Sequence, residues 1–501
     1  MELGFHLLIS TILGFLLFMV IKITKKSKAK KINSKLPPGP RKLPLIGNIH
    51  QLGTLPHQSL AKLAQEYGPL MHMQLGELSC IVVSSQDMAK EIMKTHDLNF
   101  ANRPPLLAAE IITYGYKGMT FSPHGSYWRQ MRKICTMELL TQKRVESFRL
   151  QREEELSNLV KDIILSEGSP INISEKVDSL AYGLTSRTAF GSQVEGKERY
   201  RKLMKDVSKM AGGFSLADLY PSIGILKVLT GLRQGIEKLH REMDEILENV
   251  VRSHREKNLE TGDKEETGED LVDVLLKLQK HSDLEHPLSD NILKATILDI
   301  FSAGSDTTFT ILEWAMSELI KNSQVMKKAQ AEVRSVYNEK GYVDEPNLHK
   351  LKYLKSIIKE TMRLHAPVPL LLPRQCSERC EINGYDIPAK SKVIVNAWSI
   401  CRDSRYWIEA EKFCPERFID GAVDYKGVDF RFIPFGAGRR MCPGIAFGIA
   451  NLEISLANLL FHFDWKMPNG CKADELDMDE SFGLAVRRKH DLWLVPTTYH
   501  P

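Results

Sequence analysis

Residues 434–444 (PFGAGRRMCPG) have the composition of a metal-binding loop, with Cys442 near the end. Glycines in such a loop permit tight turns and let the backbone approach a flat ligand closely. Pro443 suits the first position of a helix. A thiol at a helix N-terminus, with Arg439 and Arg440 close by, is expected to ionise. The loop therefore predicts a thiolate that binds a metal.

Cys442 has no other Cys or His ligand close by in the sequence, so the metal must be one whose other coordination positions are already filled. Haem iron meets this condition, and an axial thiolate favours O–O cleavage. The alternative is a structural cysteine beside a glycine turn. The other cysteines form no CxxC pair, and Cys376-x-x-x-Cys380 lacks the second ligand pair that a zinc site needs.

The pattern Phe435-x-x-Gly438-x-Arg440-x-Cys442-x-Gly444 resembles the haem-binding signature of the cytochrome P450 family. The similarity covers essentially the whole chain. Four further motifs resemble those of plant microsomal P450s of family 71, especially its D subfamily: Leu36-Pro-Pro-Gly-Pro, Tyr67-Gly-Pro-Leu-Met-His, Lys359-Glu-Thr-Met-Arg-Leu-His and Phe463-Asp-Trp. The resemblance implies haem b, with Cys442 as the axial ligand of the iron and Arg440 as the partner of a propionate. The other haem contacts that it implies are Phe435, Trp128, Arg132 and Arg374.

Glu360 and Arg363 lie one helical turn apart and are able to pair on one face. The spacing alone is weak evidence, because Glu146 and Arg149 share it and suit a solvated surface. Arg417 follows between this pair and the cysteine loop. The resemblance implies that Glu360, Arg363 and Arg417 form a buried triad with a structural role, for which a planar guanidinium is well suited.

Residues 290–321 are predicted to form one long helix that carries Ala303-Gly-Ser-Asp-Thr307-Thr308. Gly304 inside a helix costs about 1 kcal/mol relative to alanine, and Thr307 can bond back to the carbonyl of Ala303. Together they predict a groove for water or dioxygen, although a packing site for a small residue is the alternative. The resemblance implies that Asp306 and Thr307 relay protons. It thereby argues against P450-like isomerases and dehydratases that use no O2.

The resemblance places a group of apolar residues around the substrate, and the absence of a fixed charge among them favours a hydrophobic molecule. They are Phe121, Phe301, Ala303, Val368, Leu372 and Phe482. The expected reaction is hydroxylation or epoxidation of a plant specialised metabolite, first a terpenoid, with a flavonoid or an indole alkaloid as alternatives. A membrane-anchored binding protein that has lost haem is a non-enzymatic alternative.

The chain contains no flavin or nicotinamide motif, so its electrons must come from a partner. The resemblance implies NADPH-cytochrome P450 reductase, which would bring in NADPH indirectly. Lys133, Arg439 and Arg440 are expected to lie on the surface that docks an acidic reductase domain.

The elements that must position these residues are mostly helical. Residues 70–85 predict two short strands around Gly76-Glu77, residues 86–260 are mainly helical in pattern, and a last helix is expected over 443–461. The sequence therefore predicts a mainly α fold with small β-sheets, the cytochrome P450 fold, over residues 43–501.

The amino terminus is predicted to be a membrane anchor. The chain has 501 residues and a net charge of +5, but residues 22–42 hold nine basic groups and no acid. The 59 basic and 62 acidic residues of 43–501 give that part a net charge of −3, which does not favour nucleic acid. Residues 1–21 are long enough to span a bilayer as one helix. By the positive-inside rule, the basic and proline-rich stalk, 22–42, predicts that the catalytic domain faces the cytosol. The resemblance implies that the membrane is that of the endoplasmic reticulum.

Overall fold

The computed structural model describes residues 35–191, 197–210, 212–261, 269–281 and 283–500. The predicted anchor, residues 1–21, and most of the predicted stalk lie outside the described residues. The described end of the stalk is part of the folded body, since the Pro38 carbonyl accepts a hydrogen bond from His72 N at 2.9 Å. A Cβ on Gly39 would stand 1.9 Å from the His72 carbonyl oxygen.

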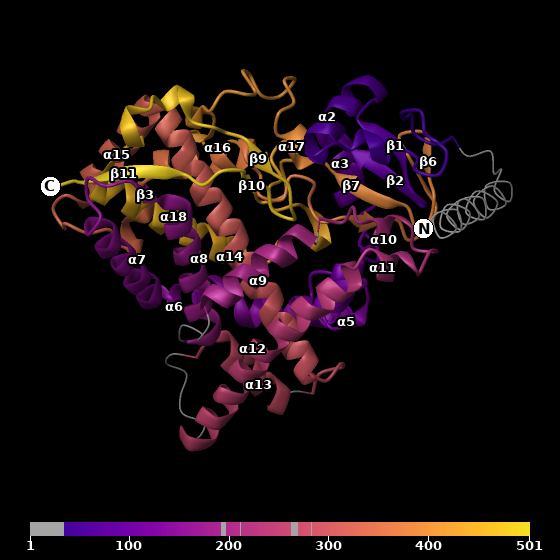
Figure 1. Ribbon diagram of the computed structural model, residues 1–501, viewed down its shortest axis with the longest axis horizontal. Helices are drawn as coiled ribbons and strands as arrows, with labels where there is room; N and C mark the ends of the chain where they lie inside the picture. The colour runs from indigo at the N-terminus through magenta and orange to yellow at the C-terminus, as the bar shows by residue number, and fades with distance from the viewer. Residues whose placement is uncertain (1–34, 192–196, 211, 262–268, 282, 501) are drawn as a thin grey trace, which may run out of the picture.

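The protein is mainly α-helical with small β-sheets, as predicted, and Figure 1 shows most of the long helices on one side of the molecule and the largest sheet, with several short helices beside it, on the other. Two long helices, α12 (Leu232–Thr261) and α14 (Asp290–Lys321), are accompanied by shorter ones. These are α2 (Pro56–Tyr67), α3 (Gln86–Lys90), α4 (Leu107–Ile112), α5 (Ser126–Ile134), α6 (Gln142–Ser147), α7 (Arg149–Ile164), α8 (Ile173–Phe190), α9 (Lys197–Met210), α10 (Leu216–Leu219), α11 (Leu226–Leu229), α13 (Leu271–His281), α15 (Ser323–Tyr337), α16 (Lys352–Leu364), α17 (Ala397–Ile400) and α18 (Ile445–His462).

The largest sheet has the strand order β1-β2-β7-β4 and joins the two ends of the domain in sequence. The predicted strands around Gly76 are β1 (Leu70–Leu75) and β2 (Leu78–Val83), which pair antiparallel. Strand β7 (Lys392–Val395) pairs parallel with β2, and β4 (Arg374–Gln375) closes the other edge. A second sheet has the order β3-β11-β8, formed by β3 (Ile171–Asn172), β11 (Trp493–Thr498) and β8 (Phe463–Lys466). Two further pairs of short strands are β5 (Cys380–Ile382) with β6 (Tyr385–Ile387), and β9 (Glu480–Ser481) with β10 (Arg487–Arg488).

Helix α14 crosses the core and packs against α8, α16 and α18. Residues 292–301 and 308–320 of this helix are buried on all sides. Residues 302–307 in its middle are less buried than the residues before and after them. The helix therefore exposes one central turn to an internal space, which the next subsection describes.

Helix α18 is the one described helix that is long and apolar enough to cross a membrane, and 61% of its apolar window is buried inside the protein. Its buried residues include Ile454, Leu456 and Leu459, which belong to the largest apolar cluster together with residues of α8, α14, α15 and α16. Helix α18 is therefore a core helix, and it follows directly after the cysteine loop.

Candidate active site

The cysteine loop is held by glycines in backbone conformations that other residues rarely adopt. Gly436 has φ +68° and Gly438 has φ +70°. A Cβ on Gly438 would stand 2.1 Å from the Met93 carbonyl oxygen, so only glycine fits there. The loop is closed by a hydrogen bond from Cys442 N to the Phe435 carbonyl at 3.0 Å. The backbone thus fixes the position of the Cys442 side chain.

One expectation about this loop is wrong. Helix α18 starts at Ile445 with Gly444 as its N-cap, so Pro443 is not the first helical residue. Burial raises the pKa of the Cys442 thiol above its usual value, and the Gly444 backbone N–H and Arg132 lower it by less. A bound metal cation would favour the thiolate form of Cys442.

An internal cavity of about 330 Å³ lies between the cysteine loop and the exposed turn of α14. Cys442 and Phe435 line it from the loop, and Ala303, Asp306 and Thr307 line it from the helix. Three of the residues predicted to face the substrate also line it: Phe121, Val368 and Leu372. The lining is mainly apolar away from the cysteine, which suits a lipophilic ligand.

Two of the predicted substrate residues do not line this cavity. Phe301 is fully buried in an aromatic cluster, with its ring centroid 5.1 Å from that of Tyr182 and 4.7 Å from that of Tyr200. It belongs to the core because it lies two residues before Ala303 and so faces the opposite side of the helix. Phe482 lines a smaller cavity that adjoins the first, where it meets Val368 and Leu370.

The arginines predicted to bind propionates gather at the cavity wall. Arg132 donates to the Met441 carbonyl at 2.6 Å, and Arg374 donates to the Ala437 carbonyl at 2.8 Å. Arg440 lies over the ring of Trp128, with its guanidinium carbon 4.4 Å from the ring centroid. Its hydrogen bonds go to the backbone carbonyls of Ala101, Met119 and Ser122. Arg440 is therefore turned inward and does not contribute to a reductase-docking surface as expected, whereas Lys133 and Arg439 are exposed.

Arg103, which the sequence did not point out, also lines the cavity, and it donates to the Leu372 and Pro373 carbonyls at 2.8 Å. Burial lowers the pKa of Arg103, Arg132, Arg374 and Arg440, and the proximity of Arg374 and Arg132 lowers that of Arg440 further, to about 9. Buried cations need anionic partners, yet the carboxylate that contacts this group is Asp97, paired with Arg374 at 3.0 Å. The cluster is therefore short of negative charge.

This arrangement fits haem. The cavity offers one thiol as an axial ligand, apolar walls for a flat macrocycle and several buried arginines for its two propionates. Cys442 would hold the iron, and Arg132, Arg374 and Arg440 would hold the propionates, with Trp128 and Phe435 beside them. When bound, haem supplies the oxygen and redox chemistry that the side chains lack.

The two residues predicted to relay protons line the cavity and have definite partners. Thr307 donates its hydroxyl proton to the Ala303 carbonyl, with an O–O distance of 2.7 Å. The hydroxyl oxygen can still accept a hydrogen bond from a donor in the cavity. The Asp306 carboxylate is ion-paired with Arg487 of β10 and accepts a hydrogen bond from Ser208 of α9 at 3.2 Å. Neither partner could be read from the sequence.

Gly304 allows close packing of helices and does not line the cavity. This favours the alternative interpretation of the sequence, a packing site for a small residue. A Cβ at Gly304 would stand 3.1 Å from the Phe447 ring of α18 and 3.3 Å from Thr185 of α8. The small residue therefore lets three helices approach one another. Ala303 and Thr307 line the cavity from α14, whereas Gly304 does not.

Asp299 is a further cavity residue that the sequence did not indicate. Its carboxylate accepts a hydrogen bond from Thr120 N at 2.9 Å, and so connects α14 to the segment before Phe121. Burial raises the pKa of Asp299 to about 6.

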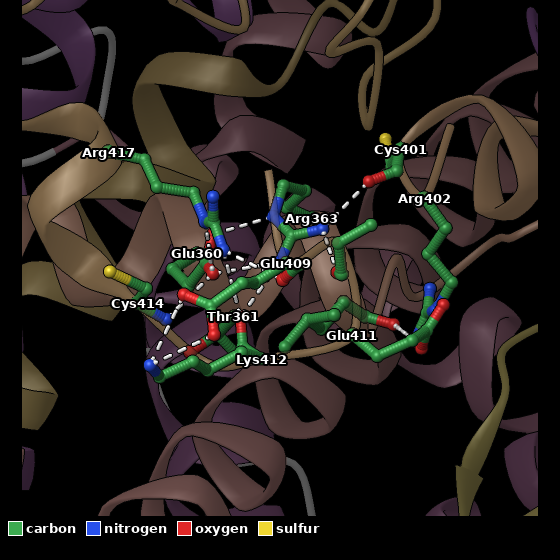
Figure 2. Close-up of polar contacts among 12 residues, drawn as sticks. Glu360, Thr361, Arg363, Cys401, Arg402, Glu409, Glu411, Lys412, Cys414 and Arg417 are labelled. Atoms are coloured by element: carbon green, nitrogen blue, oxygen red, sulfur yellow. Dashed lines mark hydrogen bonds and ion pairs between the residues drawn. The ribbon is translucent and has the colours of Figure 1, made fainter. Parts of the chain in front are cut away.

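Glu360, Arg363 and Arg417 meet in a buried cluster, which Figure 2 shows. Arg363 donates to Glu360 through two nitrogens at 2.7 and 2.8 Å, and Arg417 Nε lies 3.2 Å from Glu360 Oε1. The same oxygen accepts from Cys414 N at 2.8 Å. The arginines also donate to the carbonyls of residues 401, 408, 409, 410 and 412, so the triad fixes the segment that precedes the cysteine loop.

Comparisons with known proteins agree with this geometry. A sequence model of the family "Cytochrome P450" matches residues 37–495. "Cytochrome P450 71D10" of Glycine max is 52% identical over 504 residues, which cover 99% of this chain and 98% of that protein. "Tabersonine 16-hydroxylase 2" of Catharanthus roseus is 50% identical over 494 residues, which cover 97% and 96% of the two chains. A zebra fish cytochrome P450 solved with abiraterone has the same fold, with a TM-score of 0.75 at 21% identity, over 90% of this chain and all of that one.

The fold and the cavity thus define a haem-thiolate protein, and the chain belongs to the cytochrome P450 family. The enzyme is a P450 monooxygenase of the plant family 71 type, with haem as its cofactor. As in the family, its electrons come from a redox partner and its substrate is lipophilic.

Proposed function

We propose that the enzyme inserts one oxygen atom of O2 into a hydrophobic plant specialised metabolite, first a terpenoid, by hydroxylation or epoxidation. The observation that carries this proposal is the cavity between Cys442 and the open turn of α14, whose walls are mainly apolar. In this proposal Thr307 and Asp306 relay protons at the cavity wall, with Arg487 keeping the carboxylate of Asp306 in place. Flavonoids and indole alkaloids are the alternative substrates.

Microsomes that contain the enzyme and NADPH-cytochrome P450 reductase should be screened against these three classes, with products analysed by mass spectrometry. We expect a product that gains one oxygen atom from labelled O2 and that requires NADPH. Turnover that persists without O2 and NADPH would instead support an isomerase. A purified folded protein without colour would support a binding protein that has lost haem.

The proposal extends to the location and the electron donor. We infer that residues 1–21 anchor the enzyme in the endoplasmic reticulum and that the exposed cations Lys133 and Arg439 help to dock the acidic reductase. Lys133→Glu would repel an acidic partner, so we expect slower reduction of the enzyme by the reductase at low salt and unchanged ligand binding. Cell fractionation of the full chain should place it with microsomes, and removal of residues 1–21 should release part of it.

A further inference from the structure

A buried lysine lies at the edge of the substrate cavity. Lys392 is the first residue of β7, and its side chain is 3% exposed. Burial lowers its pKa, because a protein interior solvates an ammonium less well than water does. Among the described residues no carboxylate lies within ion-pair distance of its Nζ. Lysine is almost never fully buried unless it is paired, so this residue calls for an explanation.

The partners of Lys392 use only part of its bonding capacity. Nζ donates to the Gly213 carbonyl at 2.8 Å and lies 4.9 Å from the centroid of the Phe214 ring. An ammonium has three donors, so the carbonyl and the ring leave room for an acceptor. Asp218 attracts the ammonium from a distance, but its two oxygens already accept from Leu107 N at 2.8 Å and from Ser215 Oγ at 2.6 Å.

The space beside Lys392 adjoins the main cavity. Lys392 lines the smaller cavity, of about 40 Å³, whose lining shares Leu106, Phe121, Val368 and Leu371 with the larger one. This volume exceeds what one water molecule needs and has room for a carboxyl group. The other residues around it are mainly apolar, so Lys392 is the charged group of this space.

Gly213 keeps the approach to the ammonium open. It lines both cavities and has φ +75°. A Cβ at this position would stand 3.5 Å from Lys392 Nζ and 3.9 Å from a methyl carbon of Leu106. A side chain here would therefore occupy the gap between the main cavity and the ammonium.

We propose that Lys392 binds a carboxylate at one end of the substrate, while the apolar remainder lies in the larger cavity towards Cys442. This rests on the proposed function and narrows its substrate class to lipophilic carboxylic acids, whereas the residues chosen from the sequence carried no charge. The competing role is purely structural: Lys392 would only hold the Gly213 segment against β7. The two roles differ in whether the ammonium distinguishes an acid from a neutral molecule of equal size.

The test is ligand binding to the full-length haem-loaded enzyme, without turnover. Laurate and dodecanol share one alkyl chain and differ in charge, and their dissociation constants are measured by calorimetry and by the change in the haem spectrum. Wild type should bind laurate more tightly than dodecanol. In Lys392→Met, which keeps the stem and removes the charge, laurate should weaken about 10-fold or more and dodecanol should change little. Lys392→Arg should restore much of the preference for laurate.

Lys328→Met is the matched control, because Lys328 is half-exposed and pairs with Glu416 far from the cavity lining. It should leave both affinities unchanged. Equal weakening of laurate and dodecanol in Lys392→Met would show a structural role and overturn the proposal. Tighter binding of dodecanol than of laurate by the wild type would also overturn the proposal. This comparison does not depend on the folding of any variant. Because no step requires O2 or NADPH, failure here is separate from failure of the monooxygenase proposal.

Discussion

Replacing Glu360 by alanine should destabilise the enzyme strongly, because it leaves a charged arginine buried without its partner. Glu360 and Arg363 are both 0% exposed, and Glu360 accepts hydrogen bonds from Arg363, Arg417 and Cys414 N. Breaking a buried ion pair by removing one member costs about 3–5 kcal/mol. Total stabilities are about 5–15 kcal/mol, so the loss is a large fraction of the whole.

The damage should reach the haem site through aromatic contacts. The guanidinium carbon of Arg363 lies 5.1 Å from the centroid of the Trp407 ring. Phe432, just before the cysteine loop, lies 6.5 Å from Trp407 and 5.1 Å from Phe418, between ring centroids. Movement of residues 401–417 would therefore loosen the loop that carries Cys442. Haem should be lost at a lower urea concentration than in wild type.

The assay is urea unfolding of the haem-loaded enzyme, followed by far-ultraviolet circular dichroism and by the haem absorbance. Glu237→Ala is the control, because Glu237 pairs with Arg233 across an exposed face, with the two side chains 39% and 49% exposed. Such a pair contributes about 0.5 kcal/mol or less. Glu360→Ala combined with Arg363→Met should be less destabilised than the sum of the single variants by about 1–3 kcal/mol. A loss in Glu360→Ala no larger than in the control, or strict additivity, would refute the reasoning.

Cys442→Ala should abolish the red-shifted absorbance that carbon monoxide gives with reduced thiolate haem; an unchanged spectrum would exclude Cys442 as the ligand. Thr307→Ala should keep the fold and haem but release hydrogen peroxide in place of product, measured as the ratio of peroxide to NADPH consumed; full coupling would contradict its role in proton delivery. Gly438→Ala should prevent haem incorporation, since its Cβ would clash with a carbonyl, while Gly224→Ala, where the new Cβ meets nothing within 4 Å, should be tolerated. Asp299→Asn should gain stability relative to wild type as the pH rises from about 4 to about 6. Over that range the unfolded wild type has already released the Asp299 proton, whereas the folded state keeps it until its raised pKa of about 6, so wild-type stability falls with rising pH; equal pH profiles would contradict this.

The sequence was most informative where the chemistry is local. The Thr307 hydrogen bond spans four residues of one helix, and the glycines and the cysteine of the loop are close in sequence, so spacing alone was sufficient to pick out these positions. The helical period also explains why Phe301 does not line the cavity. Ala303 and Thr307 lie four residues apart and both line it, whereas Phe301 lies two residues before Ala303 and faces the core.

The contacts that the sequence did not indicate join residues from distant parts of the chain. Asp306 and Arg487 are separated by 181 positions, Asp97 and Arg374 by 277, and Lys392 and Gly213 by 179. Each contact depends on how the sheet and the helices pack, and no pattern within one element indicates it. A single charged residue in a sequence is usually a solvated one, so only burial in the folded chain sets these pairs apart.

The charges around the cavity explain why the fold and the cofactor depend on each other. Burial disfavours the cations Arg132, Arg374 and Arg440, and it disfavours the anion of Cys442 as well. A ligand that brings two carboxylates to the arginines and a metal cation to the sulfur relieves both penalties together. Since the unfolded chain has no such cluster, the relief appears only on binding to the folded state and adds to its stability. The same groups that select haem should therefore make the folded protein depend on it.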